Sequence, residues 1–390
     1  MVDHSVDLAG PSFDLTDEQQ MLQKMARDFV AKEIIPVAEE YDAHETFPQD
    51  IFDKAREVGL ANTNIPEEYG GMGASMFEEA LIAEEFGYGC TGIGTSVSTN
   101  GLGNLPILVG GSEEQKQYWL GERLVDNGEF VSYCVTEPAA GSNVVGMQTR
   151  AERKNGSYIL NGSKTFITNA SHAHFYTVFA KTDMEAGHRG MSCFVVERDT
   201  PGLTVSKKFD KMGQRASDTA EVTFENVEVP AENMLGKEGQ GFMIAMRVFD
   251  FSRPGVAASA VGLLRRCLEE SKKYAGERET FGKPIFQWQA IGHKIAEMAM
   301  NYEAARLLTW QAAIAVDKGA ADPMRSSFAK AFASDKAMEA AVEAVQIFGG
   351  YGYMKEYPVE KLMRDCKVFQ IYEGTSEIQR NIIVRELYRR

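Results

Sequence analysis

The sequence predicts an α+β fold in three parts: an N-terminal helical domain (residues 1–125), a middle β-barrel or sheet domain (126–235) and a C-terminal four-helix-bundle domain (236–390). In the first and last parts, apolar residues recur at the spacing of helices. In the middle part, short runs rich in β-branched and aromatic residues alternate with turn residues, as strands do. A chain of 390 residues is also too long for one small core, which favours two or three domains.

The first helix is expected to begin after Thr16. Thr16 and Gln19 have the spacing of a capping box, in which each residue satisfies a backbone N–H of the other. Leu22, Met25 and Phe29 then recur on one helical face. These three residues are therefore expected to face the core.

A glycine-rich segment in the first part matches the residues of a dinucleotide-binding motif but not the structural context that the motif requires. Gly87, Gly89 and Gly92 fit G-x-G-x-x-G, but that fingerprint requires a preceding strand. The preceding run, "MFEEALIAEEF" (76–86), is helical in pattern. We therefore expect these glycines to end a helix and to let another backbone approach closely.

The middle part contains five strand-like runs. They are "EFVSYCVT", "SYILNGSKTFITN", "FYTVFAKT", "MSCFVVERD" and "TAEVTFENVEV". Within the second run, Asn161 and Gly162 form the dipeptide most typical of a two-residue hairpin turn. A hairpin is therefore expected at that point.

The last part is helical again. Ile291, Ile295, Met298, Tyr302 and Ala305 step by four and three, as one buried face of a long helix does. Two further helices are expected C-terminal to it. Bundles of such helices can hold a cofactor in their core.

Charge and composition exclude several classes of function. The net charge of −15 argues against a nucleic-acid or anionic-membrane surface, although local basic pockets for anionic substrates remain compatible with it. No apolar stretch is long enough for a membrane span. The five cysteines are scattered, which indicates reduced thiols in an intracellular protein. The acidic N-terminal segment lacks a signal or transit pattern, so we expect a cytoplasmic protein, or a mitochondrial-matrix protein if a presequence was removed.

The sequence gives little support for a metal-binding protein or for a hydrolase. His172 and His174 could lie on one strand face, but no third ligand is near, so no metal site is expected. Walker A, G-x-S-x-G and H-E-x-x-H patterns are absent from the sequence.

The segment "YCVTEPAAGSNVVGM" (133–147) is a candidate binding loop. It leads from a strand into a Pro/Gly/Ser-rich loop whose hydroxyls and backbone N–H groups could bind the polar edge of a ring or a phosphate. A plain surface turn is the alternative, and composition alone favours it.

A second candidate is the carboxylate of Glu373 in "QIYEGTSEIQR". Gly374 breaks the helical pattern, and Ser376 and Gln379 have capping-box spacing, so a helix is expected to begin near Glu377. The carboxylate would then lie on the preceding loop among apolar neighbours, where desolvation raises its pKa and suits it to remove a proton. A solvated loop glutamate is the alternative, favoured on spacing alone.

Read together, several segments resemble one family. "YCVTEPAAGSN", "GSKTFITN", "MGQRASDT", "RETFGKPIFQWQAI" and "QIFGGYGYMKEYPVEKLMRDCKVFQIYEGTSEIQR" occur in this order. They resemble the acyl-CoA dehydrogenase family, in its medium- and short-chain straight-chain branch. The resemblance extends from about Phe13 to Leu387 and implies that family's helix–barrel–helix architecture.

The resemblance implies an FAD site between the middle domain, the C-terminal bundle and a neighbouring subunit, in a homotetramer built from dimers. It implies these contacts to FAD from the same subunit: Tyr133, Val135, Thr136, Gly141, Ser142, Phe166 and Thr168. It implies these contacts to a partner's FAD: Arg278, Thr280, Phe281, Gln346 and Gly350. Thr375 and Glu377 would flank the FAD beside the catalytic base.

The resemblance also implies a reaction. Glu373 would remove the α-proton of an acyl-CoA thioester while the β-carbon gives a hydride to FAD, forming a trans-2-enoyl-CoA. Electrons would then pass to an electron-transfer flavoprotein. Substrate contacts are implied for Thr95, Ser98, Leu102, Ser142, Asp250, Arg253, Tyr372 and Gly374.

Three positions depart from the family pattern. Phe166 stands where many relatives have Trp, Asn143 replaces a common Asp, and Ser98 occupies a place where the medium-chain branch often has Glu, which leaves the preferred chain length open. An acyl-CoA oxidase or a nitroalkane-oxidase-like enzyme on the same scaffold is the alternative, although Asp in place of Glu373 would favour the nitroalkane reaction. A non-enzymatic acyl-CoA or flavin-binding protein would be expected to have an altered base.

Overall fold

Thr16 caps the first helix as expected. The computed structural model describes residues 14–319 and 322–389. In α1 (Asp17–Phe29) the Thr16 hydroxyl accepts a hydrogen bond from the Gln19 backbone, and the Gln19 side chain accepts one from Thr16. Leu22 and Phe29 are buried, but Met25 is 36% exposed, because the buried face of the helix turns toward Ala26 instead.

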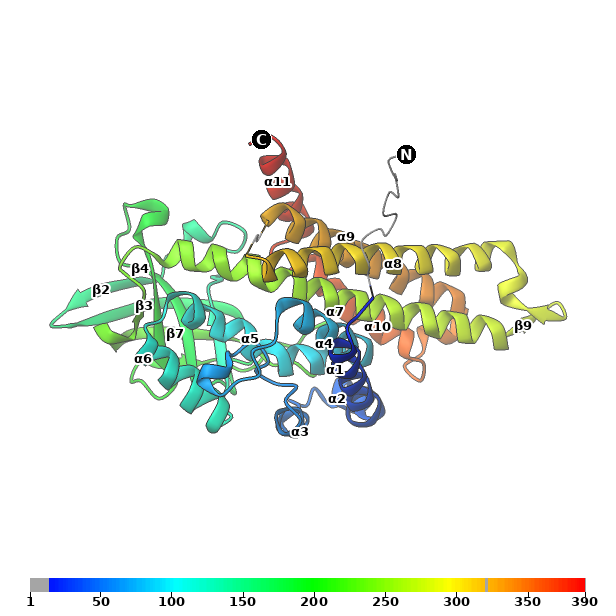
Figure 1. The fold of residues 1–390 in the computed structure, drawn as a ribbon, viewed down its shortest axis with the longest axis horizontal. Coiled ribbons are helices and arrows are strands. Elements are labelled where there is room, and N and C mark those ends of the chain that lie inside the picture. The colour runs from blue at the N-terminus through cyan, green and yellow to red at the C-terminus, as the bar shows by residue number, and fades with distance from the viewer. Residues whose placement is uncertain (1–13, 320–321, 390) are drawn as a thin grey trace, which may run out of the picture.

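The N-terminal helices lie together on one side of the molecule (Figure 1). After α1 they are α2 (Ala38–His44), α3 (Gln49–Glu57), α4 (Met76–Gly89), α5 (Thr91–Gly110) and α6 (Glu113–Lys116). The glycine-rich segment ends α4, as expected. A Cβ atom at Gly87 would lie 2.2 Å from the backbone oxygen of Ser259, so glycine allows α4 to contact the backbone of the long helix α7 (Gly241–Glu277).

The middle part forms one eight-stranded sheet (Figure 1). Its strands are β1 (Val131–Cys134), β2 (Arg150–Lys154), β3 (Ser157–Thr168), β4 (Phe175–Lys181), β5 (Met191–Glu197), β6 (Leu203–Val205), β7 (Thr219–Pro230) and β8 (Met234–Leu235). They are ordered β6-β7-β3-β2-β4-β5-β8, and β1 pairs in parallel with β4. One face packs against α5 and the start of α7, where residues of all three elements share a buried apolar cluster.

The hairpin predicted at Asn161 and Gly162 is wrong. β3 continues through both residues, and the pairing with β7 shifts register there, as at a β-bulge. Gly162 has a φ of +149°, and a Cβ atom on it would lie 2.5 Å from the Thr149 hydroxyl. The two-residue hairpin turn is instead formed by Asn155 and Gly156, both at positive φ, between β2 and β3.

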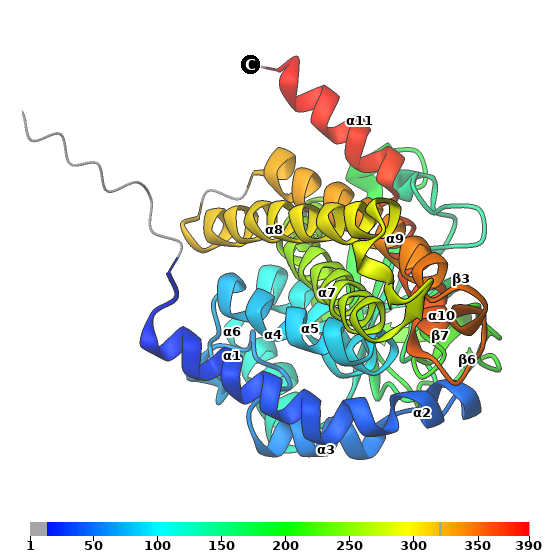
Figure 2. The same cartoon turned by 90° about the vertical axis from the view of Figure 1, so that its right-hand side faces the viewer.

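Long helices form the C-terminal part and share one apolar core. They are α7, α8 (Gln289–Asp317), α9 (Pro323–Phe348) and α10 (Pro358–Cys366). The predicted buried face of α8 is confirmed at Met298, Tyr302 and Ala305, which are at most 9% exposed, whereas Ile291 and Ile295 are only partly buried against the same core. The final helix, α11 (Ser376–Leu387), packs on α9 and projects from the body on the side opposite α1 (Figure 2).

α7 joins the two halves of the molecule. It runs from the sheet to the short strands β9 (Glu279–Thr280) and β10 (Lys283–Pro284) at the other end of the bundle (Figure 1). Pro254 lies inside α7 and lacks the N–H that would bond to the carbonyl of Asp250. The Ser326 hydroxyl donates to that carbonyl instead, over 3.4 Å.

Several broader expectations can be compared with this fold. The α+β arrangement of helices, sheet and helices is confirmed, whereas the domain boundaries at 125 and 235 stay a prediction. All five cysteines are free and buried. None of the helices in the described ranges is long and apolar enough to cross a membrane.

The two histidines do not share a strand face. His172 and His174 precede β4, where the His172 ring stacks on Phe47 at 3.6 Å and His174 accepts a hydrogen bond from the Phe130 backbone. Within the described part of the chain, no group of three or more His, Cys, Asp or Glu side chains could hold a metal ion.

Candidate active site

One large cavity brings together most of the predicted site. It has a volume of about 1700 Å³ and lies among α4, α5, α7, the sheet and the C-terminal loop. It is lined by these predicted residues: Thr95, Ser98, Leu102, Tyr133, Val135, Thr136, Gly141, Ser142, Phe166, Thr168, Asp250, Arg253, Tyr372, Glu373, Gly374 and Thr375. Sequence segments nearly 300 positions apart therefore meet around one space.

Glu373 occupies a backbone conformation that few non-glycine residues adopt. Its φ is +54°, and Gly374 follows at +89°. Such a conformation costs about 1–3 kcal/mol and persists only where the surroundings impose it. The Gln379 side chain donates to the carbonyls of Glu373 (3.1 Å) and Gly374 (3.0 Å), and the buried ammonium of Lys330 donates to Gly374 (2.6 Å).

Burial and three neighbouring side chains set the pKa of the Glu373 carboxylate. Burial raises its pKa, and this effect outweighs the hydrogen bond that Ser252 donates at 2.6 Å and the positive charges of Arg253 and Lys330. Burial in turn lowers the pKa of Lys330 to about 8, against the opposing charge of Glu373. A carboxylate with a raised pKa is a stronger base than a solvated one, which suits proton abstraction.

The start of α11 differs from the prediction by one residue. Thr375 is the N-cap, and its hydroxyl accepts from the Ile378 backbone at 3.2 Å. Ser376 donates instead to Asp335 at 2.9 Å. Gln379 cannot complete the predicted capping box because its amide is committed to the turn that carries Glu373.

The sheet side of the cavity fits a planar aromatic group with polar edges. The Tyr133 hydroxyl is buried and has no hydrogen-bond partner among the described residues. A Cβ atom at Gly141 would meet nothing within 4 Å, which leaves the loop backbone open to a ligand. The Phe166 ring is 68% exposed, on a residue with a φ of +57°. An orphaned donor, an open backbone and an exposed ring are the features expected where a flavin binds.

A buried ion pair between Lys164 and Glu137 supports the loop on the sheet side of the cavity. The Lys164 ammonium donates to Glu137 at 2.6 Å and to the Val135 carbonyl at 3.3 Å. The other contacts of Glu137 are backbone N–H groups of Gln148 and Thr149. Lys164 lowers the pKa of Glu137 despite its burial. Sequence reasoning missed this pair, although both residues lie in segments that carry the family resemblance.

Six predicted cofactor residues lie outside the cavity. Arg278, Thr280 and Phe281 lie at the end of the bundle farthest from the sheet, beside β9 (Figure 1). Gln346 and Gly350 lie nearby at the end of α9, where Tyr274 of α7 stacks on Phe348. Their predicted contact with a partner's FAD stays a prediction.

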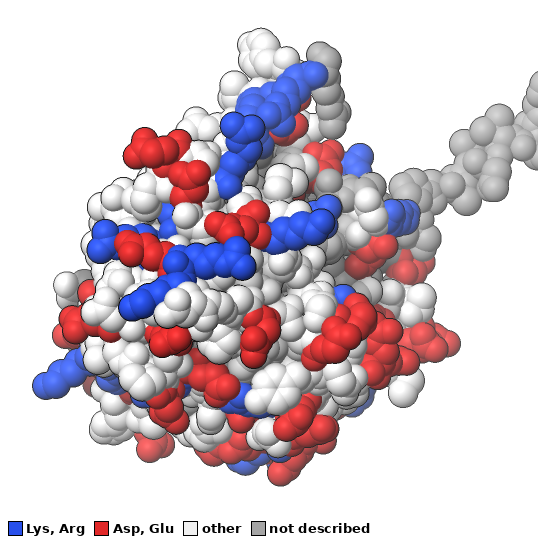
Figure 3. All heavy atoms as spheres, turned by 90° about the vertical axis from the view of Figure 1, so that its left-hand side faces the viewer, with Lys and Arg blue, Asp and Glu red and all other residues white. Residues whose placement is uncertain are grey.

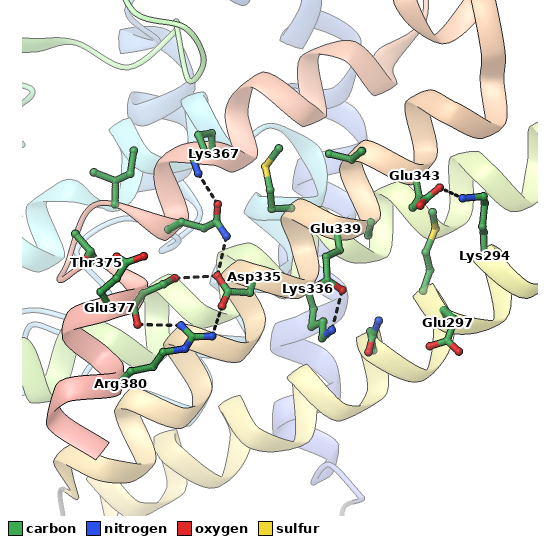
Figure 4. Close-up of a pocket in the computed structure, with 18 of the residues that line it drawn as sticks. Lys294, Glu297, Asp335, Lys336, Glu339, Glu343, Lys367, Thr375, Glu377 and Arg380 are labelled. Atoms are coloured by element: carbon green, nitrogen blue, oxygen red, sulfur yellow. Dashed lines mark hydrogen bonds and ion pairs between the residues drawn. The ribbon is translucent and has the colours of Figure 1, made fainter. Parts of the chain in front are cut away.

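Glu377, the sixth, lines a second pocket of about 900 Å³ between α8, α9 and α11 (Figure 4). Asp335 also lines it and accepts hydrogen bonds from Gln370, Ser376 and Arg380. Thr375 lines both this pocket and the large cavity. A ligand that extends past Thr375 could therefore occupy both spaces.

Family models match almost the whole chain. The acyl-CoA dehydrogenase N-terminal, middle and C-terminal domain models match residues 16–125, 132–227 and 239–388. An acyl-CoA dehydrogenase of Bacillus subtilis is 46% identical over 374 residues, which cover 96% of this chain and 98% of the relative. A probable mitochondrial medium-chain acyl-CoA dehydrogenase of Caenorhabditis briggsae is 45% identical over 380 residues, covering 96% and 92%.

Solved structures agree with these matches. The butyryl-CoA dehydrogenase of Megasphaera elsdenii superposes with a TM-score of 0.94 at 42% identity, over 97% of this chain and 100% of the other. A chain from a study of the electron-transferring flavoprotein of Acidaminococcus fermentans gives a TM-score of 0.95 at 44% identity, with the same coverage. The chain therefore belongs to the acyl-CoA dehydrogenase family. The predicted family and fold class are confirmed, and with them its description as an FAD-dependent oxidoreductase.

Replacing Lys164 by Met is expected to destabilise the protein and weaken its hold on FAD, because it leaves the Glu137 carboxylate buried without its partner. Removing one member of a buried pair costs about 3–5 kcal/mol. Urea denaturation and the FAD-to-protein absorbance ratio measure the two effects. Lys154→Met, at an exposed end of β2, is the control. Equal stability and equal FAD content in both variants would show that the pair does not support the loop.

Proposed function

We propose that this protein oxidises the Cα–Cβ bond of a fatty acyl-CoA to the trans-2-enoyl-CoA and passes the electrons to an electron-transfer flavoprotein. The observation that carries the proposal is the position of Glu373, a carboxylate of raised pKa in the wall of the cavity that the predicted flavin contacts also line. The named relatives act on acyl-CoA substrates, and one similar chain comes from work on an electron-transferring flavoprotein.

FAD would lie against the sheet side of the cavity. Tyr133, Val135, Thr136, Phe166 and Thr168 would contact its ring system. The loop residues Gly141 and Ser142 would contribute backbone and hydroxyl contacts. When bound, FAD supplies the acceptor for the hydride that leaves the β-carbon.

Glu373 would hold the proton taken from the α-carbon. The thioester makes this proton acidic only if its carbonyl oxygen receives hydrogen bonds as negative charge develops. The backbone N–H of Glu373 would be one donor to that oxygen. The turn fixes the carboxylate and this N–H relative to each other, so that one segment both binds the thioester and removes its proton.

Basic residues would receive the anionic CoA portion. The cavity is lined by Lys211, Arg247, Arg253 and Arg385. The Arg253 guanidinium forms an ion pair with the Asp250 carboxylate over 3.5 Å. On the sheet-side face, Lys and Arg side chains gather in the upper half, whereas Asp and Glu predominate below (Figure 3). A chain of net charge −15 therefore still offers a local site for phosphates.

We further propose that the active unit is a homo-oligomer, a tetramer built from dimers. Arg278 would bind the diphosphate of a partner's FAD through charge-assisted hydrogen bonds, with Thr280, Phe281, Gln346 and Gly350 around it. Thr375 and Glu377 would contact the FAD of their own subunit, along the path from the large cavity to the second pocket. The 94% exposure of Phe281 supports an interface at this end of the bundle.

Glu373→Gln is expected to keep the yellow colour and the binding of acyl-CoA but to lose flavin reduction, because the amide cannot accept the proton. Anaerobic bleaching by butyryl- and octanoyl-CoA measures this. Glu122→Gln, at an exposed position, should bleach at the rate of the unmodified protein. Bleaching of Glu373→Gln at a similar rate would remove Glu373 from the reaction. Rapid reoxidation by air during turnover would favour the oxidase alternative.

The rate of flavin reduction is expected to rise with pH through the raised pKa of Glu373, because only the carboxylate accepts a proton. Ser252→Ala removes a donor that stabilises the carboxylate, so the pKa should rise further and the profile should move to higher pH. Stopped-flow bleaching across a pH series tests this. Ser271→Ala, on the same helix and with an unpartnered hydroxyl, should leave the profile in place. A shift of the Ser252→Ala profile to lower pH would contradict the assignment.

Arg278→Ala is expected to weaken FAD binding, since it removes a cation from the proposed partner site. Titration of the apoprotein with FAD, followed by flavin fluorescence, gives the dissociation constant. Lys272→Ala, at an exposed position near the end of α7, should bind FAD normally. Equal FAD affinity in the two variants would exclude Arg278 from the site.

A further inference from the structure

The cavity extends beyond the residues that surround Glu373. On α5, the small residues Gly94 and Ser98 line it one helical turn apart, and Ile82 and Ala83 of α4 line the facing side. Ser98 is exposed to this space. The cavity is also lined by these residues, which precede α4, lie in its first turn or end α8: Leu60, Asn62, Thr63, Asn64, Glu79 and Asp317. We refer to this part as the distal end.

Glu79 is the carboxyl group that faces the distal end. Its Oε1 accepts a hydrogen bond from the Thr63 hydroxyl at 2.9 Å. Within residues 14–319 and 322–389, no Lys or Arg forms an ion pair with it. Burial raises the pKa of Glu79 to about 7, the Thr63 hydrogen bond opposes this, and the charge of Asp317 adds to it.

Asp317 does not offer a comparable acceptor, because both of its oxygens are used elsewhere. They accept the backbone N–H groups of Met76 (2.6 Å) and Phe77 (3.0 Å) at the start of α4. Asp317 therefore caps a helix and leaves its negative charge near Glu79. Glu79 is thus the carboxyl of the distal end that keeps an oxygen without a hydrogen bond among the described residues, and it lies in a negative field.

The distal end lacks the cations that line other parts of the cavity. The cationic side chains that line the cavity are Lys211, Arg247, Arg253 and Arg385. None of the distal-end residues is cationic. A chain that ends in a carboxylate would be repelled there. A chain that ends in a methyl group would bury Glu79 with no donor beyond the Thr63 hydroxyl.

We propose that Glu79 selects acyl chains whose far end carries a hydrogen-bond donor, a hydroxyl or an ammonium, over plain alkyl chains of the same length. This inference rests on the proposed function, since it assigns the distal end to the acyl group. Sites built to bond a substrate donor discriminate strongly against analogues that lack it. Ser98 leaves room for the chain to pass, so the preferred substrates are long enough to reach beyond that residue.

The test is anaerobic reduction of the holoenzyme by octanoyl-, decanoyl- and dodecanoyl-CoA and by their ω-hydroxy and ω-amino counterparts. We expect one of the two donor-bearing series to exceed the plain series in kcat/KM by about tenfold or more at the best length. The series that does so identifies the donor. Equal rates for all three series, or faster reduction by plain chains, would overturn the proposal.

Variants connect the preference to Glu79. Glu79→Leu should reverse it in favour of plain chains, whereas Glu57→Leu, an exposed carboxyl of α3, should leave it unchanged. Glu79→Gln keeps the volume and provides the test if Glu79→Leu does not fold: it should abolish a preference for the amino series but retain one for the hydroxy series. An unchanged preference for the amino series in Glu79→Gln, or for either series in Glu79→Leu, would overturn the proposal.

The outcomes separate this inference from the proposed function. If plain chains bleach the flavin without any preference for donor-bearing ends, the proposed function stands and the role of Glu79 fails. If no acyl-CoA of any series bleaches the flavin, the proposed function itself fails.

Discussion

The left-handed turn at Glu373 is the constraint on which the site depends. A non-glycine residue holds a φ of +54° only because groups from separate elements bind the carbonyls around it. Lys330 from α9 and Gln379 from α11 hold the backbone, while Ser252 from α7 holds the carboxylate. The Glu373 carboxylate therefore takes this orientation only when α7, α9 and α11 are packed together. Folding of the bundle and assembly of the catalytic geometry are thus coupled.

Local features of the fold could be predicted from the sequence, and features set by distant contacts could not. The cap of α1 and the buried face of α8 depend on neighbouring residues and were predicted correctly. The Asn-Gly pairs at 155–156 and 161–162 carry the same local turn signal, but of these two only the first forms a hairpin. The pair at 161–162 is held within β3, where Gly162 packs against Thr149. The periodicity of the chain contains no trace of that contact.

The candidate site shows the same division. The resemblance to a family identified most of the residues that line the cavity, because that information comes from long motifs. The groups that set the chemistry of Glu373 were missed, since Ser252 and Lys330 lie 121 and 43 positions away in the chain and reach it only through tertiary packing. Lys164 and Glu137 were missed for the same reason.

Burial raises the pKa of Glu373 and of Glu79, which are two of the carboxyl groups that line the cavity. Glu373 also has a serine donor and two cations nearby, which favour its ionised form. Glu79 has a threonine donor and an anion. The same side chain can therefore act as a base in one place and as a specificity contact in another, according to the charges around it.

The 37 residues of α7 form a single helix about 55 Å long, with Pro254 inside it, that packs on the sheet at its start and in the bundle at its end. The sheet and the bundle are therefore joined by a helix packed against both rather than by a loop. Pro254, where one backbone hydrogen bond of this helix is missing, is the position at which α7 bends most easily.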